Sequence, residues 1–137
     1  MKFSYREFFM KSLAKGCKEE DFTPEINSNV RELVKRINSL GYEPAMYFSS
    51  CLRSKEWHKQ IYLNKGVSED KIPWGSSHLS GKAADISDPD GKLAKWLQEN
   101  EDKLEAAQLW CEHPNYTKGW CHVQSVPPKS GNRFFIP

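Results

Sequence analysis

The sequence predicts a single α+β domain in which a small antiparallel sheet carries the candidate active residues and helices pack on one of its faces. Two patterns support this prediction. Apolar residues recur at helical spacing between residues 27 and 40, and several short apolar runs are bounded by turn-forming residues. The length of 137 residues is enough for one compact core and too short for two ordinary domains.

Three helices are predicted. The first spans residues 27–40, begins at an Asn-Ser capping pair and is ended by Gly41. A second helix is expected over residues 54–63, and a third from residue 92 to about residue 104. The first helix would bury the apolar residues that share one face, which are Val30, Leu33, Val34, Ile37 and Leu40.

Strands are predicted where short apolar segments lie between turn-forming residues. Residues 67–79 have the composition of a loop, and residues 88–91 (D-P-D-G) form a strong turn. The tail from residue 126 to residue 137 has no periodicity and is expected to pack through Phe134, Phe135 and Ile136. The predicted strands cover residues 45–48, 81–86, 108–112 and 119–123.

The charge pattern and the N-terminal sequence exclude several classes of function. The net charge is only +2, from 20 basic and 18 acidic residues scattered along the chain, so a nucleic-acid partner is not expected. No apolar run reaches membrane-spanning length, and residues 1–10 lack the features of a signal peptide. We therefore expect a soluble monomer that is made in the cytoplasm and has no membrane partner.

The segment with the clearest chemical pattern is residues 76–86, which reads S-S-H-L-S-G-K-A-A-D-I. It places an imidazole, His78, and a carboxylate, Asp85, on either side of small residues that let the backbone bring the two together. Zinc accepts neutral imidazole nitrogen and carboxylate oxygen, and a catalytic zinc site has three protein ligands and a fourth position for water. A third ligand is therefore expected elsewhere in the chain.

His122 is the candidate for this third ligand. In a strand through this region, Trp120, His122 and Gln124 share one face, while Cys121 and Val123 point to the other. Two histidines and one carboxylate form a known catalytic zinc set. The sequence thus predicts a Zn²⁺ site made of His78, Asp85 and His122.

These residues resemble those of a known family. The pattern S-x-H-x-x-G-x-A-x-D from Ser76 to Asp85, followed by W-x-H at residues 120–122, is similar to the pattern of the D-Ala-D-Ala carboxypeptidase and L-alanyl-D-glutamate endopeptidase family of zinc peptidases. Upstream, residues 50–54 (S-C-L-R-S) are similar to the family's S-G-x-R-S. The resemblance also takes in Gln60 and the closing segment through Arg133, and covers roughly residues 27–137.

The resemblance implies a fold, an activity and a setting. The fold would be that shared by these peptidases and the hedgehog signalling domain, and the activity would be zinc-dependent hydrolysis of a peptide bond in the stem peptide of bacterial peptidoglycan. Phage and bacterial cell-wall enzymes belong to this family. A lysis enzyme of a phage or prophage agrees with a chain that lacks an export signal and acts on the cell wall after release.

The resemblance also implies substrate-binding residues. Arg53 would bind a carboxylate or backbone oxygens of the substrate, because the planar guanidinium suits such groups. Gln60 and Ser76 are further candidates. For Ser76 the alternatives are a hydrogen bond to the loop that carries His78 and a simple turn cap.

A general base is needed to take a proton from water and return it to the leaving amine. Glu112 is the candidate, because a loop joins its strand to that of His122 and can bring the two together. The family pattern instead has a glutamate or aspartate three residues before the last histidine, where this chain has Gly119. Cys51 is a second departure, at a position where the family has glycine.

Other interpretations of these residues stay open at this point. The protein can be a binding or virion-structural domain that recognises cell-wall peptide without cutting it, or a zinc-free domain whose histidines are ordinary polar residues. His58 and His113 are expected to be structural, and Asp88 and Asp90 to form a turn rather than a calcium site. The cysteines lack any C-x-x-C spacing and are expected to be reduced thiols; they are Cys17, Cys51, Cys111 and Cys121.

Overall fold

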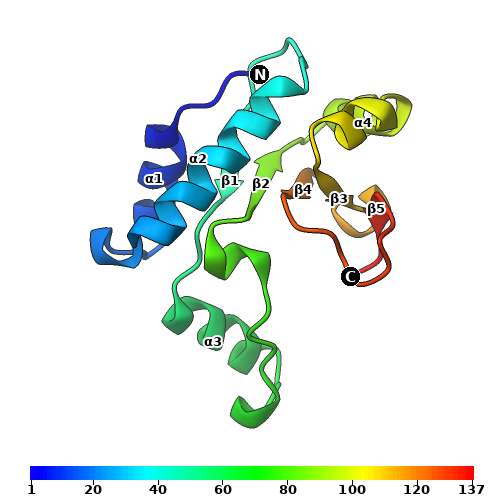
Figure 1. Ribbon diagram of the computed structural model, residues 1–137. Helices are drawn as coiled ribbons and strands as arrows, with labels where there is room; N and C mark the ends of the chain where they lie inside the picture. Colours follow the sequence, from blue (N-terminus) through cyan, green and yellow to red (C-terminus); the bar gives the residue numbers. More distant parts are fainter.

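The computed structural model describes residues 1–137 and has an α+β fold with one five-stranded sheet (Figure 1). No helix is long and apolar enough to cross a lipid bilayer. The helices are α1 (Tyr5–Ala14), α2 (Pro24–Ser39), α3 (Lys55–Asn64), α4 (Lys92–Glu99) and α5 (Glu101–Ala106). The strands are β1 (Phe48–Ser50), β2 (Ala83–Ser87), β3 (Trp110–Glu112), β4 (Trp120–Gln124) and β5 (Phe134–Phe135).

The sheet is mixed, so the prediction of a purely antiparallel sheet was wrong. Its strand order is β1-β2-β4-β3-β5, in which β3 and β5 are parallel and the other neighbours are antiparallel. The tail after residue 126 returns alongside β3 and forms β5, where Phe134 packs against the core. Ile136 is 71% exposed, so the expectation that it packs was also wrong.

Three other predicted elements differ from the structure. The first strand covers residues 48–50 rather than 45–48, and its register with β2 runs from Phe48 to Ser50. The predicted helix over residues 92–104 is two helices, separated at Asn100, whose side-chain amide donates to the carbonyl of Trp96. The predicted loop over residues 67–79 contains two 3₁₀ turns, Glu69–Lys71 and Ser77–Ser80.

Helix α1 was not predicted, and α2 begins earlier than expected. Ser4 caps α1, because its hydroxyl accepts from the Glu7 N–H and the Glu7 carboxylate accepts from the Ser4 N–H. Thr23 caps α2, and Pro24 fills the first helical position, where its missing N–H is of no consequence. The helix therefore starts three residues before residue 27.

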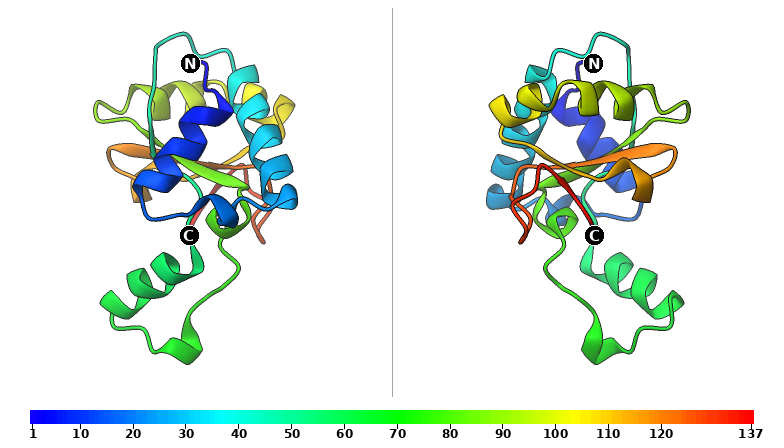
Figure 2. Two further views of the ribbon diagram at one scale, coloured as in Figure 1. Left: turned by 90° about the vertical axis from the view of Figure 1, so that its left-hand side faces the viewer. Right: turned by 90° about the vertical axis from the view of Figure 1, so that its right-hand side faces the viewer.

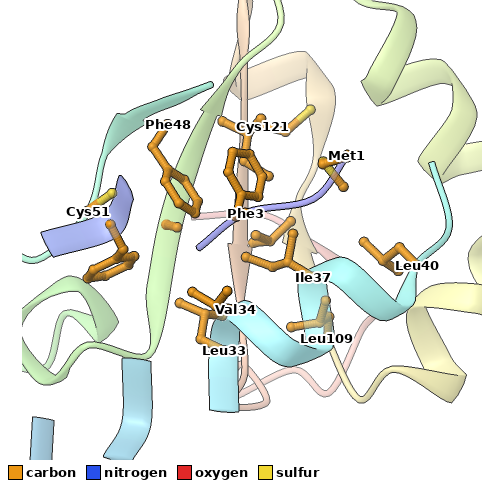
Figure 3. Packing of buried hydrophobic residues seen from close by; sticks show 14 of the residues in the cluster. Met1, Phe3, Leu33, Val34, Ile37, Leu40, Phe48, Cys51, Leu109 and Cys121 are labelled. Atoms are coloured by element: carbon orange, nitrogen blue, oxygen red, sulfur yellow. The ribbon is translucent and has the colours of Figure 1, made fainter. Parts of the chain in front are cut away.

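The hydrophobic core is formed by residues of the sheet and of helices α1, α2, α4 and α5. Figure 3 shows the part of it near α2. Helix α2 contributes Leu33, Val34 and Ile37 to it, and the ring of Phe3 stacks on that of Phe48 with centroids 3.9 Å apart. Helix α3 contributes no residue to this core and lies apart from the other helices (Figure 2). The prediction that helices pack on one face of the sheet therefore holds for α1, α2, α4 and α5 but not for α3.

Side-chain alternation gives the two faces of the sheet different roles. Ala84 and Ile86 of β2 and Cys121 and Val123 of β4 are buried in the core. The intervening side chains, which include Asp85 and His122, lie on the opposite face. The prediction that Cys121 points away from the candidate site is thus confirmed. All four cysteines are free and buried.

Gly81 connects the turn Ser77–Ser80 to β2 in a conformation that needs glycine. Its φ is +74°, and a Cβ atom there would lie 2.9 Å from Val30 Cγ2 and 3.3 Å from the carbonyl oxygen of Ile26. We expect Gly81→Ala to lower the free energy of unfolding by about 2–4 kcal/mol, from backbone strain and overpacking against α2. Urea unfolding measures this change.

A matched control separates the two causes. Gly41 has a φ of +80°, but a Cβ atom there would meet no atom within 4 Å. Gly41→Ala should therefore cost only the strain of about 1–2 kcal/mol. Equal losses for the two variants would contradict the role of close packing at Gly81.

Candidate metal centre

Three side chains from separate segments meet on the sheet face opposite the core. His78, Asp85 and His122 each offer one ligand atom, and these atoms lie within 4.8 Å of one another. Asp85 Oδ1 is the common neighbour, because it lies 3.3 Å from His78 Nε2 and 2.9 Å from His122 Nδ1. This group could hold a metal ion, and it is the group of residues that the sequence predicted.

Local structure explains why the three meet. Asp85 and His122 are directly paired across β2 and β4, so their side chains share one face. His78 lies in the 3₁₀ turn Ser77–Ser80, whose first N–H groups are capped by Ser76; the Ser76 hydroxyl accepts from the His78 N–H at 3.3 Å. Gly81 then reverses the chain into β2. Ser76 therefore caps the turn that carries His78, and its role in substrate binding stays a prediction.

Both imidazoles are oriented by a second hydrogen bond. His78 Nδ1 must donate to the carbonyl oxygen of Cys51, 2.9 Å away, because a carbonyl can only accept. His122 Nε2 lies 2.8 Å from Gln124 Oε1, and the amide nitrogen of Gln124 donates to the Val126 carbonyl, which fixes which amide atom faces the ring. In the neutral rings, His78 Nε2 and His122 Nδ1 are therefore the unprotonated nitrogens that a metal ion requires, and when protonated they donate to Asp85.

The electrostatics of the group suit a cation. Burial alone would raise the pKa of Asp85, but hydrogen bonds with His122 and His78 lower it to about 2, so the carboxylate is ionised at neutral pH. Burial likewise would lower the pKa of His122, while its hydrogen bond to Asp85 raises it above the ordinary value. A proton therefore competes with a metal for His122 Nδ1, so metal affinity falls as the pH falls.

Glu112 lines the same open cleft as His122, a cleft of about 720 Å³. The pairing of β3 with β4 places Cys111 opposite Val123, and its continuation places Glu112 beside His122 on the site face. Burial raises the pKa of Glu112, an effect that the nearby His122 and His78 oppose and Asp85 reinforces. The other walls come from Ser76 and the loop before it and from the C-terminal segment, at residues 126–130 and 135–137.

The structure does not bring Arg53 and Gln60 into this cleft. Arg53 lines a different groove, near the start of α3, and one of its terminal nitrogens lies 3.2 Å from His58 Nδ1. Gln60 is exposed on α3 and bonds to Asn64. Their roles in substrate binding stay predictions.

The polar residues that the sequence indicated as structural do lie outside the metal group. His58 is buried and hydrogen-bonded at both ring nitrogens, and His113 Nδ1 accepts from the N–H of Asn115. Asp88 accepts from the N–H groups of Leu93 and Ala94, so its carboxylate caps α4. These three side chains are explained by their own contacts.

Two contributors to the centre were not identified from the sequence. Gln124 was placed on the face of His122 by alternation, and that pattern could have indicated its contact with the ring. The carbonyl of Cys51 has no sequence signal, because any residue offers a backbone oxygen. The structure alone shows that this carbonyl faces the His78 ring.

Comparisons of the chain with protein-family models, with curated proteins and with solved structures found no match.

Proposed function

We propose that this chain is a zinc-dependent peptidase that hydrolyses a peptide bond in the stem peptide of bacterial peptidoglycan. The observation that carries the proposal is the convergence of His78, Asp85 and His122, the last of which lines a cleft that Glu112 also lines. A buried three-ligand group beside an open cleft leaves one side of the centre for water or substrate. The motif resemblance described above supplies the substrate class.

The donor set agrees with zinc as the metal. Zinc bonds of about 2.0–2.2 Å in a tetrahedral arrangement leave neighbouring ligand atoms about 3.3–3.6 Å apart. His78 Nε2 lies 3.3 Å from Asp85 Oδ1, at the lower end of this range, whereas His122 Nδ1 lies 2.9 Å from the same oxygen and would have to move away by about 0.4 Å to share an ion with it. Two neutral imidazoles and one carboxylate favour zinc over calcium or magnesium, which prefer oxygen ligands.

Glu112 is the residue that we propose moves the proton. When bound, zinc would polarise the scissile carbonyl and lower the pKa of water. The carboxylate of Glu112 would accept the proton from this water and pass it to the leaving amine. Its raised pKa makes the carboxylate a stronger base toward the proton of water, and a pKa nearer the working pH suits a group that acts first as a base and then as an acid.

The walls of the cleft would hold the substrate in an extended form. Its lining includes Ser76 and Ser77 with Pro73 and Gly75, together with residues 126–130. Arg53 would act from the neighbouring groove, where it would meet a more distant carboxylate or backbone oxygen of the stem peptide. We place the enzyme in phage or prophage lysis, where it would reach the wall after release from the cytoplasm.

In the second candidate function, the protein binds zinc and cell-wall peptide but does not hydrolyse the peptide. It is a domain that binds cell-wall peptide as a virion or structural component. The observation that favours it is Gly119, an exposed turn residue at the position where the family has its acidic residue. A site without an effective base would bind substrate and leave it uncut.

Digestion of purified peptidoglycan separates these functions. The protein with added zinc is incubated with cell walls, and the released muropeptides are analysed by mass spectrometry. New peptide termini with the wild type, absent with His78→Ala, would support the peptidase and identify the bond. Cell-wall binding with no new termini would favour the binding domain. The absence of both cell-wall binding and new termini would rule out both functions.

A further inference from the structure

The segment from residue 55 to residue 75, here called the arm, is separate from the main core. It contains α3 and the turn Glu69–Lys71, which an ion pair of 2.7 Å between Lys59 and Glu69 joins. Both views of Figure 2 show it projecting from the body of the molecule. Its residues Tyr62, Pro73 and Gly75 nevertheless line the cleft beside the metal centre, so the place of the arm sets one wall of that cleft.

His58 is the only fully buried residue of α3, with 0% of its surface exposed. Its Nδ1 lies 3.2 Å from a guanidinium nitrogen of Arg53, and its Nε2 lies 2.6 Å from the carbonyl oxygen of Pro73. Its ring also lies against Tyr62 and Trp74, with centroid distances of 4.8 and 5.2 Å. One side chain thus joins both ends of the arm.

The two partners fix the form of this histidine. Arginine has only donors and a carbonyl has only acceptors, so Nδ1 must accept and Nε2 must donate. His58 is therefore neutral with its proton on Nε2. Burial lowers its pKa, Arg53 and His78 lower it further, and the bond to Pro73 opposes them.

Arg53 connects this contact to the metal centre. Its backbone N–H donates to the carbonyl of His78 at 3.1 Å, and it lies two residues after Cys51, whose carbonyl accepts from the His78 ring. The segment that orients His78 is therefore the segment that His58 holds through the guanidinium. Residues 51–53 therefore contact both the arm, through His58, and the candidate metal ligand His78.

We propose that His58 is a positioning residue that docks the arm on the body and so fixes the cleft wall against which the substrate peptide binds. The part that concerns substrate rests on the proposed function. The docking itself rests on the contact of His58 with Arg53, while its contacts with Tyr62, Pro73 and Trp74 hold the two parts of the arm together. Substrate binding should therefore depend on this residue, although it touches neither the metal ligands nor the cleft.

Three variants test the inference. His58→Phe keeps a ring between Tyr62 and Trp74 but loses both hydrogen bonds. His58→Gln can accept from Arg53 and donate to Pro73 with its amide, so it should rescue in part. His113→Phe is the control, because this histidine lies outside the arm and the metal group.

Two measurements give separate answers. Hydrogen–deuterium exchange should rise about tenfold over residues 55–75 in His58→Phe, as expected when buried hydrogen-bonding groups lose their partners, and stay unchanged in β2 and β4. In muropeptide hydrolysis, KM should rise about tenfold while kcat and zinc content stay near the wild-type values. Exchange and KM of His58→Gln should lie between those of the wild type and those of His58→Phe. Both values for His113→Phe should match the wild type.

The outcomes distinguish this inference from the proposed function. Wild-type exchange in the arm of His58→Phe would overturn the docking role, whether or not the protein is a peptidase. A fall in kcat with unchanged KM would overturn the role in substrate binding. A wild type that hydrolyses nothing, together with a loosened arm in His58→Phe, would overturn the proposed function and leave the docking role supported.

Discussion

Replacing His78 with alanine is expected to lower zinc affinity by more than about a hundredfold and to abolish hydrolysis, because loss of only a hydrogen-bond partner of a metal ligand already costs about 10–100-fold. His78 is 4% exposed, so no outside ligand can readily take its place. Asp85 and His122 would remain as two ligands of a three-ligand site. Metal analysis of the purified variant and calorimetric titration with zinc measure the loss.

The control and a graded variant sharpen this test. His113→Ala removes a histidine outside the group and should leave zinc affinity unchanged. Gln124→Leu removes the acceptor for His122 Nε2 and should lower the affinity by about 10–100-fold. A chelator should lower the melting temperature of the wild type and leave that of His78→Ala unchanged. Full zinc content in His78→Ala would contradict the assignment of the ligands.

Replacing Glu112 with glutamine should reduce kcat by about 10²–10⁴-fold and leave zinc binding intact, which is the range expected for loss of a general base. The amide has nearly the shape of the carboxylate but cannot take up a proton. The raised pKa of Glu112 also predicts that activity is lost as the pH falls through this value, because the base is then protonated. Initial rates of muropeptide hydrolysis measure both effects.

Glu105→Gln is the matched control, because this glutamate is exposed on α5 and does not line the cleft. It should keep the rate of the wild type. Retention of activity in Glu112→Gln would show that another group takes the proton. A wild type as inactive as the variant, yet bound to cell walls, would favour the binding domain over the peptidase.

The metal group could be predicted because its signals are local. His78 and Asp85 lie within one short segment of small residues, and the strand period of two places His122 on the site face and Cys121 in the core. Their meeting could not be derived from spacing alone. It depends on the pairing of β2 with β4, which places Asp85 beside His122 and is a tertiary contact.

Helix α1 and strand β5 were not predicted, for two different physical reasons. Helix α1 has a local signal, the capping pair Ser4 and Glu7, which the aromatic run after it obscured. Strand β5 has none, because two residues form it only by pairing with β3. The contact of Arg53 with His58 likewise joins side chains whose packing no periodicity describes.

The division of the sheet into two faces limits how this sequence can change. An insertion or deletion of one residue within β4 would turn His122 toward the helices and Cys121 toward the cleft, so core and metal group would fail together. The turn between β3 and β4, at residues 113–119, lies outside the paired registers. Relatives of this protein should therefore vary in length at that turn, while the number of residues in β2 and β4 stays constant.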